Sequence, residues 1–155
     1  MNVYRLCRKD EIEKILTDKS FKDVGECFQT DPKKNNFQYA EGVKYLHFFK
    51  DESSLLFLNT LKGRFICDYD IPDGILAEHK GVGQYRNFIK FNSLVPVAEY
   101  AVESDLMKFE YLKRVDKIIT DIDYEDYFFD PSLKGFKENI YNQINLKTIG
   151  AEREL

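Results

Sequence analysis

The sequence predicts a single domain of the α+β class, and three observations lead to this prediction. Twice in the first half of the chain, a short segment rich in β-forming residues passes directly into a segment with helical spacing. In the second half, further strand-like segments follow one another. The 155 residues are 43% hydrophobic and 15% aromatic, which is enough to bury one substantial core but hardly two.

The first strand–helix unit lies at the N-terminus. The segment "NVYRL" (2–6) is rich in β-formers and predicts a short strand. In "KDEIEKILTDK" (9–19), helical spacing puts three apolar residues on one face, namely Ile12, Ile15 and Leu16. Residues 20–43 then combine Asp, Asn, Pro and Gly with isolated aromatic residues, which is typical of an irregular loop anchored by its rings. This loop is either a lid or a long connection.

A second strand–helix unit and a third strand follow. The segment "KYLHFF" (44–49) predicts a strand, and "DESSLLFLNTL" (51–61) predicts a short helix that Asp51 is placed to cap. In "GRFICDYDIP" (63–72), apolar and polar residues alternate, which predicts a strand at 64–71.

Asp68 and Asp70 lie on the same face of this third strand. Paired carboxylates at this spacing fit acid–base chemistry, and they fit a solvent-facing edge at least as well.

The rest of the chain contains further strands and helical turns. We expect one or two helical turns in "DGILAEHK" (73–80) and a glycine-containing loop in "GVGQYRNF" (81–88). The alternating segments "VAEYAVE" (97–103) and "YLKRVDKII" (111–119) predict two more strands. Helical spacing in "SLKGFKENIYNQIN" (132–145) predicts a C-terminal helix.

Several classes of site and partner are disfavoured by composition. The formal net charge of -4 argues against a nonspecific nucleic-acid binder, which needs a basic excess to neutralise phosphates. The three cysteines, Cys7, Cys27 and Cys67, are widely spaced, so we expect reduced, mostly buried thiols without a disulfide framework or zinc knuckle. The two histidines, His47 and His79, have no partner at metal-ligand spacing, and we expect no metal site and no hydrolase triad.

The chain also lacks an apolar run of the roughly 20 residues that a membrane span requires. Its first residues, "MNVYRLCRKDEIEK", carry charges where the apolar segment of a signal peptide would lie. We therefore expect a soluble, cytoplasmic protein with no membrane partner. The acidic tract "DIDYEDYFFD" (121–130) is either a solvated connector or a segment that docks a partner.

The order of these segments resembles the ADP-ribosyltransferase family, whose members bind NAD and transfer its ADP-ribose. The similarity rests on "VYR" in the first strand, "YLHFF" in the second and the glutamate of "VAEYAVES" at the head of a late strand. It covers about residues 2–118 and leaves 119–155, with the acidic segment and the helix, outside the core. The resemblance implies a mixed, mainly antiparallel sheet core, split into two small sheets with flanking helices.

The resemblance also implies a set of site residues. Arg5 matches an arginine or histidine that contacts the nicotinamide ribose or the diphosphate of NAD. The segment from Tyr45 to Phe49 matches the second strand of the family, and Glu99 matches the catalytic glutamate. We therefore expect Arg5, the strand around His47 and Glu99 to converge on one cleft.

The chemistry of the reaction calls for these residue types. Breaking the bond between nicotinamide and ribose passes through an oxocarbenium-like state, which the carboxylate of Glu99 would stabilise. Arg5 supplies a planar fork of donors, and Phe48 and Phe49 supply ring faces for nicotinamide. Tyr45 and His47 complete the cofactor-binding set, with His47 holding a ribose hydroxyl.

Two departures from the family bear on the acceptor. The second strand has no S-T-S triplet, and Val97 stands where a second Glu or Gln would precede Glu99. The arginine-targeting signature is therefore missing, so we expect an acceptor other than an arginine side chain: a protein, a nucleic acid or a small molecule.

Alternatives exist for the protein and for each residue. Alternatively, the chain is a catalytically inactive binding module on the same fold, or an RNA 2′-phosphotransferase. The latter needs basic residues for a phosphorylated RNA end, and the acidic balance of the chain counts mildly against it. In the alternative interpretation, Arg5 is a surface residue with a carboxylate partner. Glu99 is then a residue that faces solvent in an alternating strand. His47 is otherwise a hydrogen-bonded, partly buried histidine, and Tyr45 an ordinary packing ring.

Overall fold

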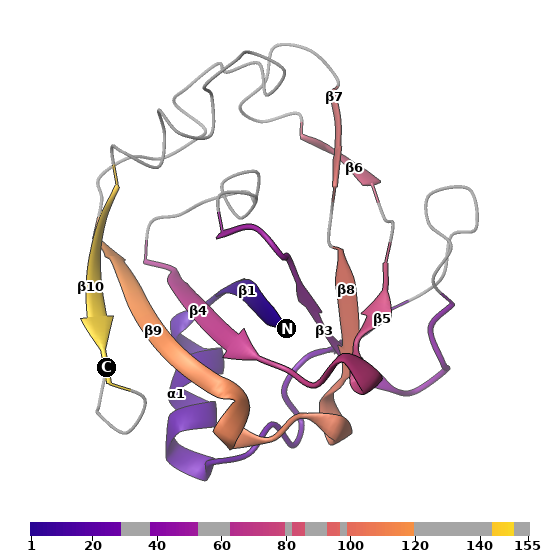
Figure 1. Ribbon diagram of the computed structural model, residues 1–155, viewed down its shortest axis with the longest axis horizontal. Helices are drawn as coiled ribbons and strands as arrows, with labels where there is room; N and C mark the ends of the chain where they lie inside the picture. The colour runs from indigo at the N-terminus through magenta and orange to yellow at the C-terminus, as the bar shows by residue number, and fades with distance from the viewer. Residues whose placement is uncertain are drawn as a thin grey trace.

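A computed structural model describes residues 1–28, 38–52, 63–79, 82–85, 93–96, 99–119 and 144–150. In this part of the chain, one α-helix accompanies antiparallel β-strands that form two four-stranded sheets and one hairpin (Figure 1). The α+β class predicted from the sequence is confirmed.

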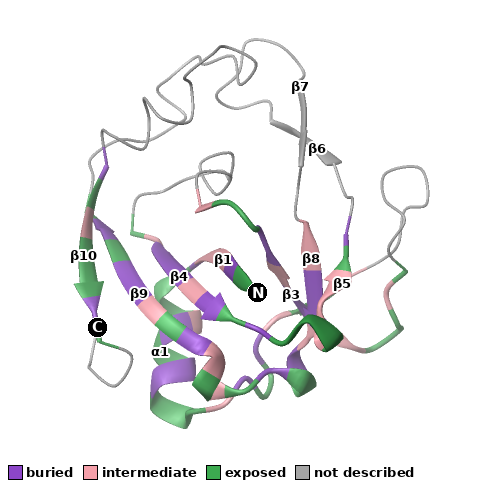
Figure 2. Ribbon diagram, in the orientation of Figure 1, coloured by how far each residue is buried: buried purple, intermediate pink, exposed green. Residues whose placement is uncertain are grey.

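The first sheet has the strand order β1-β4-β9-β10. These strands are β1 (Asn2–Cys7), β4 (Phe65–Asp70), β9 (Leu112–Ile119) and β10 (Asn145–Ile149), and each neighbouring pair is antiparallel. Buried residues line both β1 and β4 (Figure 2). Those in the core cluster are Val3, Cys7, Phe65, Cys67 and Tyr69, whereas Arg5 is only partly buried. Arg5 lies opposite Cys67 in the register of these two strands.

The second sheet has the order β2-β3-β8-β5, again with antiparallel neighbours. Its strands are short: β2 (Glu26–Cys27), β3 (Lys44–Phe48), β8 (Tyr100–Glu103) and β5 (Ala77–Glu78). A separate hairpin pairs β6 (Val82–Tyr85) with β7 (Ser93–Pro96). An isolated β-bridge between Tyr4 and Phe49 joins the two four-stranded sheets. The backbone nitrogen of each residue lies 2.7 or 2.9 Å from the carbonyl oxygen of the other.

The helix α1 (Lys9–Asp18) packs on this core through the three residues that the helical spacing predicts, Ile12, Ile15 and Leu16. It ends where Lys19 adopts a left-handed conformation and its N–H binds the carbonyl of Ile15. The buried cluster includes residues of α1, of the first sheet and of β3 and β8, so both sheets share one core. Short 3₁₀ turns lie at Asp73–Ile75 (η2), Ser104–Leu106 (η3) and Phe109–Tyr111 (η4).

Five predicted strands are present with boundaries shifted by three residues or fewer: β1, β3, β4, β8 and β9. The prediction of a loop at 81–88 was wrong, because Val82–Tyr85 forms β6. The prediction of a C-terminal helix at 132–145 was wrong at its last residue, because Asn145 begins β10. The predicted helix at 51–61 falls mostly outside the described residues, as do the acidic tract at 121–130 and the remainder of the C-terminal helix.

The cysteines are free thiols: Cys7 and Cys67 are buried with their sulfur atoms 3.6 Å apart, and Cys27 is exposed. Within the described residues, no helix has the length and apolar character needed to cross a membrane.

Candidate active site

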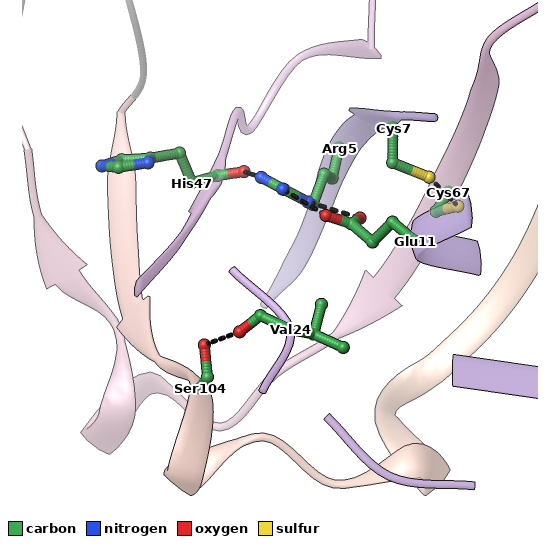
Figure 3. Close-up of polar contacts among 7 residues, drawn as sticks. All are labelled: Arg5, Cys7, Glu11, Val24, His47, Cys67 and Ser104. Atoms are coloured by element: carbon green, nitrogen blue, oxygen red, sulfur yellow. Dashed lines mark hydrogen bonds and ion pairs between the residues drawn. The ribbon is translucent and has the colours of Figure 1, made fainter. Parts of the chain in front are cut away.

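Arg5 projects from β1 toward the start of α1 and is held there by Glu11. Its Nε and Nη2 donate to the two carboxylate oxygens of Glu11 at 2.9 and 2.6 Å, and its Nη1 donates to the carbonyl oxygen of His47 at 3.2 Å (Figure 3). Only 18% of the Arg5 side chain and 16% of the Glu11 side chain are exposed. Burial lowers the pKa of Arg5, but the adjacent carboxylate outweighs it and raises the pKa above its ordinary value.

A cavity of about 580 Å³ opens beside Arg5. Residues from Arg5 to Arg8 line one side, and the segment from Asp23 to Glu26 lines another. The cavity therefore lies where β1 of the first sheet faces β2 of the second. Further lining residues are the cations Lys14 and Arg64 and the anions Asp10 and Glu11, so the wall carries both signs of charge.

A second group of polar side chains surrounds His47 on β3. The hydroxyl of Tyr39 lies 2.5 Å from Nε2 of His47 and 2.6 Å from Nε2 of His79, and the two imidazole rings have centroids 5.0 Å apart. His47 is paired with Ala101 of β8, which is paired with Ala77 of β5.

Aromatic rings pack against this group. The ring of Phe28 meets the His47 ring edge-on at 4.4 Å, and Tyr45 meets Tyr39 at 5.1 Å. Burial, the neighbouring His79 and the Arg5 charge lower the pKa of His47 to about 3. Burial raises the pKa of Tyr39 to about 12. His47 and Tyr39 are therefore both uncharged at neutral pH.

Glu99 immediately precedes β8 and is tied to both neighbouring strands. Its N–H donates to the carbonyl of Phe48 at 3.0 Å, and its own carbonyl accepts from the N–H of His79 at 2.7 Å. Its carboxylate lies 3.7 Å from Nζ of Lys50, and 26% of the Glu99 side chain is exposed.

The predicted site residues on β1 and β8 both bind β3. The side chain of Arg5 donates to the carbonyl of His47, and the backbone N–H of Glu99 donates to the next carbonyl, that of Phe48. The cavity beside Arg5 is lined by neither His47 nor Glu99. The two charged side chains have separate partners, Glu11 for Arg5 and Lys50 for Glu99.

The predicted ring platforms lie in the interior. Phe48 is fully buried and packs edge-on against Tyr69 with ring centroids 5.3 Å apart, while Phe49 and Tyr45 are 2% and 5% exposed. Sequence reasoning missed three site residues: Glu11, Tyr39 and His79. His79 was considered only as a metal ligand or base, and Tyr39 carried no signal beyond its place as an isolated ring in a polar segment.

A separate charged cluster lies on the first sheet. Arg114 of β9 contacts Glu52, lies 3.3 Å from Oδ2 of Asp116 and 3.9 Å from Oδ2 of Asp68. Asp70 instead binds the N-terminal ammonium group at 3.2 Å. The two predicted carboxylates of β4 therefore have different cationic partners. Within the described residues, no group of three or more His, Cys, Asp or Glu side chains is arranged to hold a metal ion.

A comparison with protein-family models found no match, and searches among curated proteins and solved structures found no similar protein.

Proposed function

We propose that this chain is an NAD-dependent ADP-ribosyltransferase that acts on an acceptor other than an arginine side chain. The observation that carries the proposal is the meeting of three segments at the junction of the two sheets. The Arg5 side chain on β1 donates to the carbonyl of His47 on β3 at 3.2 Å, and the backbone N–H of Glu99, at the head of β8, donates to the carbonyl of Phe48 at 3.0 Å. The resemblance implies an arginine on the first strand and a glutamate at the head of a late strand, and this arrangement supports the proposal.

Glu99 has the role of the carboxylate beside the reacting ribose. Positive charge develops on the ribose as the bond to nicotinamide breaks, and a nearby carboxylate stabilises it. The Glu99 side chain is partly exposed, and its partner Lys50 is 66% exposed at 3.7 Å. An ion pair of this kind contributes little, so a bound ligand can displace the lysine.

Arg5 has the role of a donor to the diphosphate or ribose of NAD. Three of its N–H groups are occupied by Glu11 and the His47 carbonyl, and a guanidinium has five. The remaining groups belong to a side chain that lines a cavity of about 580 Å³, within the range of roughly 300–1,000 Å³ typical of small-molecule sites. Arg8, Lys14 and Arg64 add positive charge to the same cavity.

A catalytically inactive binding module is the second candidate, and one observation favours it. Both charged groups of the site are already paired inside the protein, Arg5 with Glu11 at 2.6 Å and Glu99 with Lys50 at 3.7 Å. The net charge of -4 counts mildly against the RNA 2′-phosphotransferase alternative, because a phosphorylated RNA end requires a basic surface.

One experiment with purified protein and NAD distinguishes the two candidate functions. Binding is measured by isothermal titration calorimetry, and nicotinamide release is measured by chromatography, with water serving as acceptor where no other is present. Release above that of heat-unfolded protein supports the transferase. Binding without release favours the inactive module, and the absence of both contradicts the proposal.

A further inference from the structure

Cys7 and Cys67 are two thiols that the proposed reaction does not use. Their sulfur atoms lie 3.6 Å apart although the residues come from different strands, β1 and β4 (Figure 3). In the register of these strands, Cys7 pairs with Phe65 and Cys67 pairs with Arg5. The two cysteines are therefore diagonal neighbours on one face of the sheet, and no large rearrangement is needed to bring their sulfur atoms together.

The pair is buried, but one of its members borders a cavity. Cys67 is fully buried and Cys7 is 5% exposed. Cys7 also lines the cavity of about 580 Å³ between β1 and β2, which is much larger than the roughly 30 Å³ that one water molecule occupies in the liquid. A small oxidant that enters this cavity therefore meets Cys7 first, and Cys67 is in contact with Cys7 on the inner side.

Oxidation of the pair by a peroxide proceeds in two steps that balance. The Cys7 sulfur attacks one peroxide oxygen, the O–O bond breaks, and one water leaves while Cys7 becomes a sulfenic acid. The Cys67 sulfur then attacks the Cys7 sulfur, the S–S bond forms and a second water leaves. The two thiols lose two electrons and two protons in total, and one hydrogen peroxide becomes two waters.

We propose that Cys7 and Cys67 form a reversible disulfide with a peroxide as oxidant, and that this bond is a redox switch acting on Arg5 at the wall of the cavity. Both thiols adjoin Arg5, since Cys67 lies opposite it and Cys7 is two residues farther along the same face of β1. The sulfur atoms approach from 3.6 Å to about 2.0 Å as the bond forms, so β1 and β4 must adjust around Arg5. This inference does not depend on the proposed function.

The positions of the two cysteines make the bond reversible and its formation slow. Diagonal neighbours in an antiparallel pair are about 7–8 Å apart, at the upper limit of about 7 Å between the Cα atoms of a disulfide, so the bond is strained and easily reduced. The contact with Cys67 and burial raise the pKa of the Cys7 thiol above its ordinary value. The reactive thiolate is therefore scarce at neutral pH, and the reaction should accelerate as pH rises.

The chemical test uses Cys27→Ser, which removes the exposed thiol and leaves Cys7 and Cys67 as the only cysteines. After treatment with hydrogen peroxide, mass spectrometry without reductant should show the loss of two hydrogen atoms and a linked pair of Cys7 and Cys67 peptides. Dithiothreitol should reverse the change, and the reaction should be faster at about pH 9 than at neutral pH. Cys7→Ser in the same background is the control and should give no linked pair. Wild-type protein with Cys27 alkylated repeats the test without a substitution.

A second readout follows the switch itself. The Nε–H of Arg5, which donates to Glu11 at 2.9 Å, gives an NMR signal that should move on oxidation, return on reduction and stay in place in Cys7→Ser under the same peroxide. Thermal melts confirm that each protein is folded. Oxidation that stops at sulfenic or sulfinic acid, that links two copies of the chain or that leaves both thiols free overturns the proposal. A disulfide that forms without moving the Arg5 signal overturns the switch.

Discussion

Glu11 is the residue that keeps the Arg5 guanidinium in the interior. Its two carboxylate oxygens accept from Arg5 at 2.9 and 2.6 Å, and both side chains are more than four-fifths buried. A buried charge without a partner is costly. Removing one partner therefore destabilises the protein by more than the whole ion pair stabilises it. The sequence predicts the strand and the helix that carry these residues. It does not predict the pair, which depends on how α1 packs against β1.

Replacement of this carboxylate should destabilise the protein. We expect Glu11→Gln to lower the free energy of unfolding by about 2–4 kcal/mol, since the Arg5 charge stays buried without a counter-charge. Glu13→Gln is the matched control on the same helix, because Glu13 pairs with Lys9 at 3.4 Å and both are at least half exposed. It should change stability by less than about 0.5 kcal/mol. Urea denaturation measures both, and equal values contradict this account of Arg5.

His47 makes stability depend on pH. Its pKa is about 3 in the folded protein and about 6.5 in an unfolded chain. Below pH 6.5 the unfolded state binds more protons, so stability falls as pH decreases toward 3. We expect the free energy of unfolding to fall by on the order of 1–2 kcal/mol between pH 7.5 and pH 5, and to fall by less in His47→Gln. Denaturation at the two pH values measures it, and identical pH dependence in both proteins contradicts the burial of a neutral His47.

At the scale of elements, β2 is held in place by the close approach of Gly25. Gly25 has a φ of +94°, and a Cβ there would lie 2.6 Å from both the Tyr45 carbonyl oxygen and Oγ of Ser104. Ser104 in turn donates to the carbonyl of Val24 at 2.5 Å. The segment that lines the cavity opposite Arg5 is therefore fixed to β3 and to the η3 turn.

Gly25→Ala should release this segment. We expect the free energy of unfolding to fall by about 2 kcal/mol or more, because of the left-handed φ and because the new Cβ would clash with backbone that cannot move aside. Gly42→Ala is the control, since Gly42 also has a positive φ of +73° but its Cβ meets nothing within 4 Å. It should cost only about 1 kcal/mol of backbone strain. If denaturation gives both variants the same stability, the close approach at Gly25 does not contribute to the stability of the protein.

Local sequence patterns predict the longer elements and fail for those that depend on pairing. Alternation, β-forming residues and helical spacing are sufficient for β1, α1, β3, β4 and β9, because each element has buried residues in the core. The strands β2 and β5 have two residues each, too few to show a period. In "NLKTI", the β10 strand forms by pairing with β9 from Asn145 onward, and this pairing overrides the helical spacing that continues up to Ile144.

At the scale of the whole molecule, Arg5 and Glu99 both bind neighbouring carbonyls of β3. The side chain of Arg5 donates to the His47 carbonyl at 3.2 Å, and the backbone N–H of Glu99 donates to the Phe48 carbonyl at 3.0 Å. The expectation that Arg5, His47 and Glu99 share one cleft stays a prediction, since the cavity beside Arg5 is lined by neither His47 nor Glu99. Tyr39 and His79 could not be predicted, because they reach His47 through the folding of loops rather than through any periodic pattern. The cavity next to Arg5 depends on how far β1 and β2 diverge, which no local pattern encodes.

The central claim is that Glu99 stabilises the reacting ribose, and nicotinamide release by Glu99→Gln tests it most directly. Glutamine keeps the shape but removes the negative charge, so turnover should fall about 10²- to 10³-fold while NAD affinity changes far less. Glu103→Gln, at the other end of β8, is the matched control and should keep wild-type turnover. Thermal melts confirm equal folding. Equal, nonzero rates for the wild-type protein and Glu99→Gln would show that Glu99 has no part in the reaction.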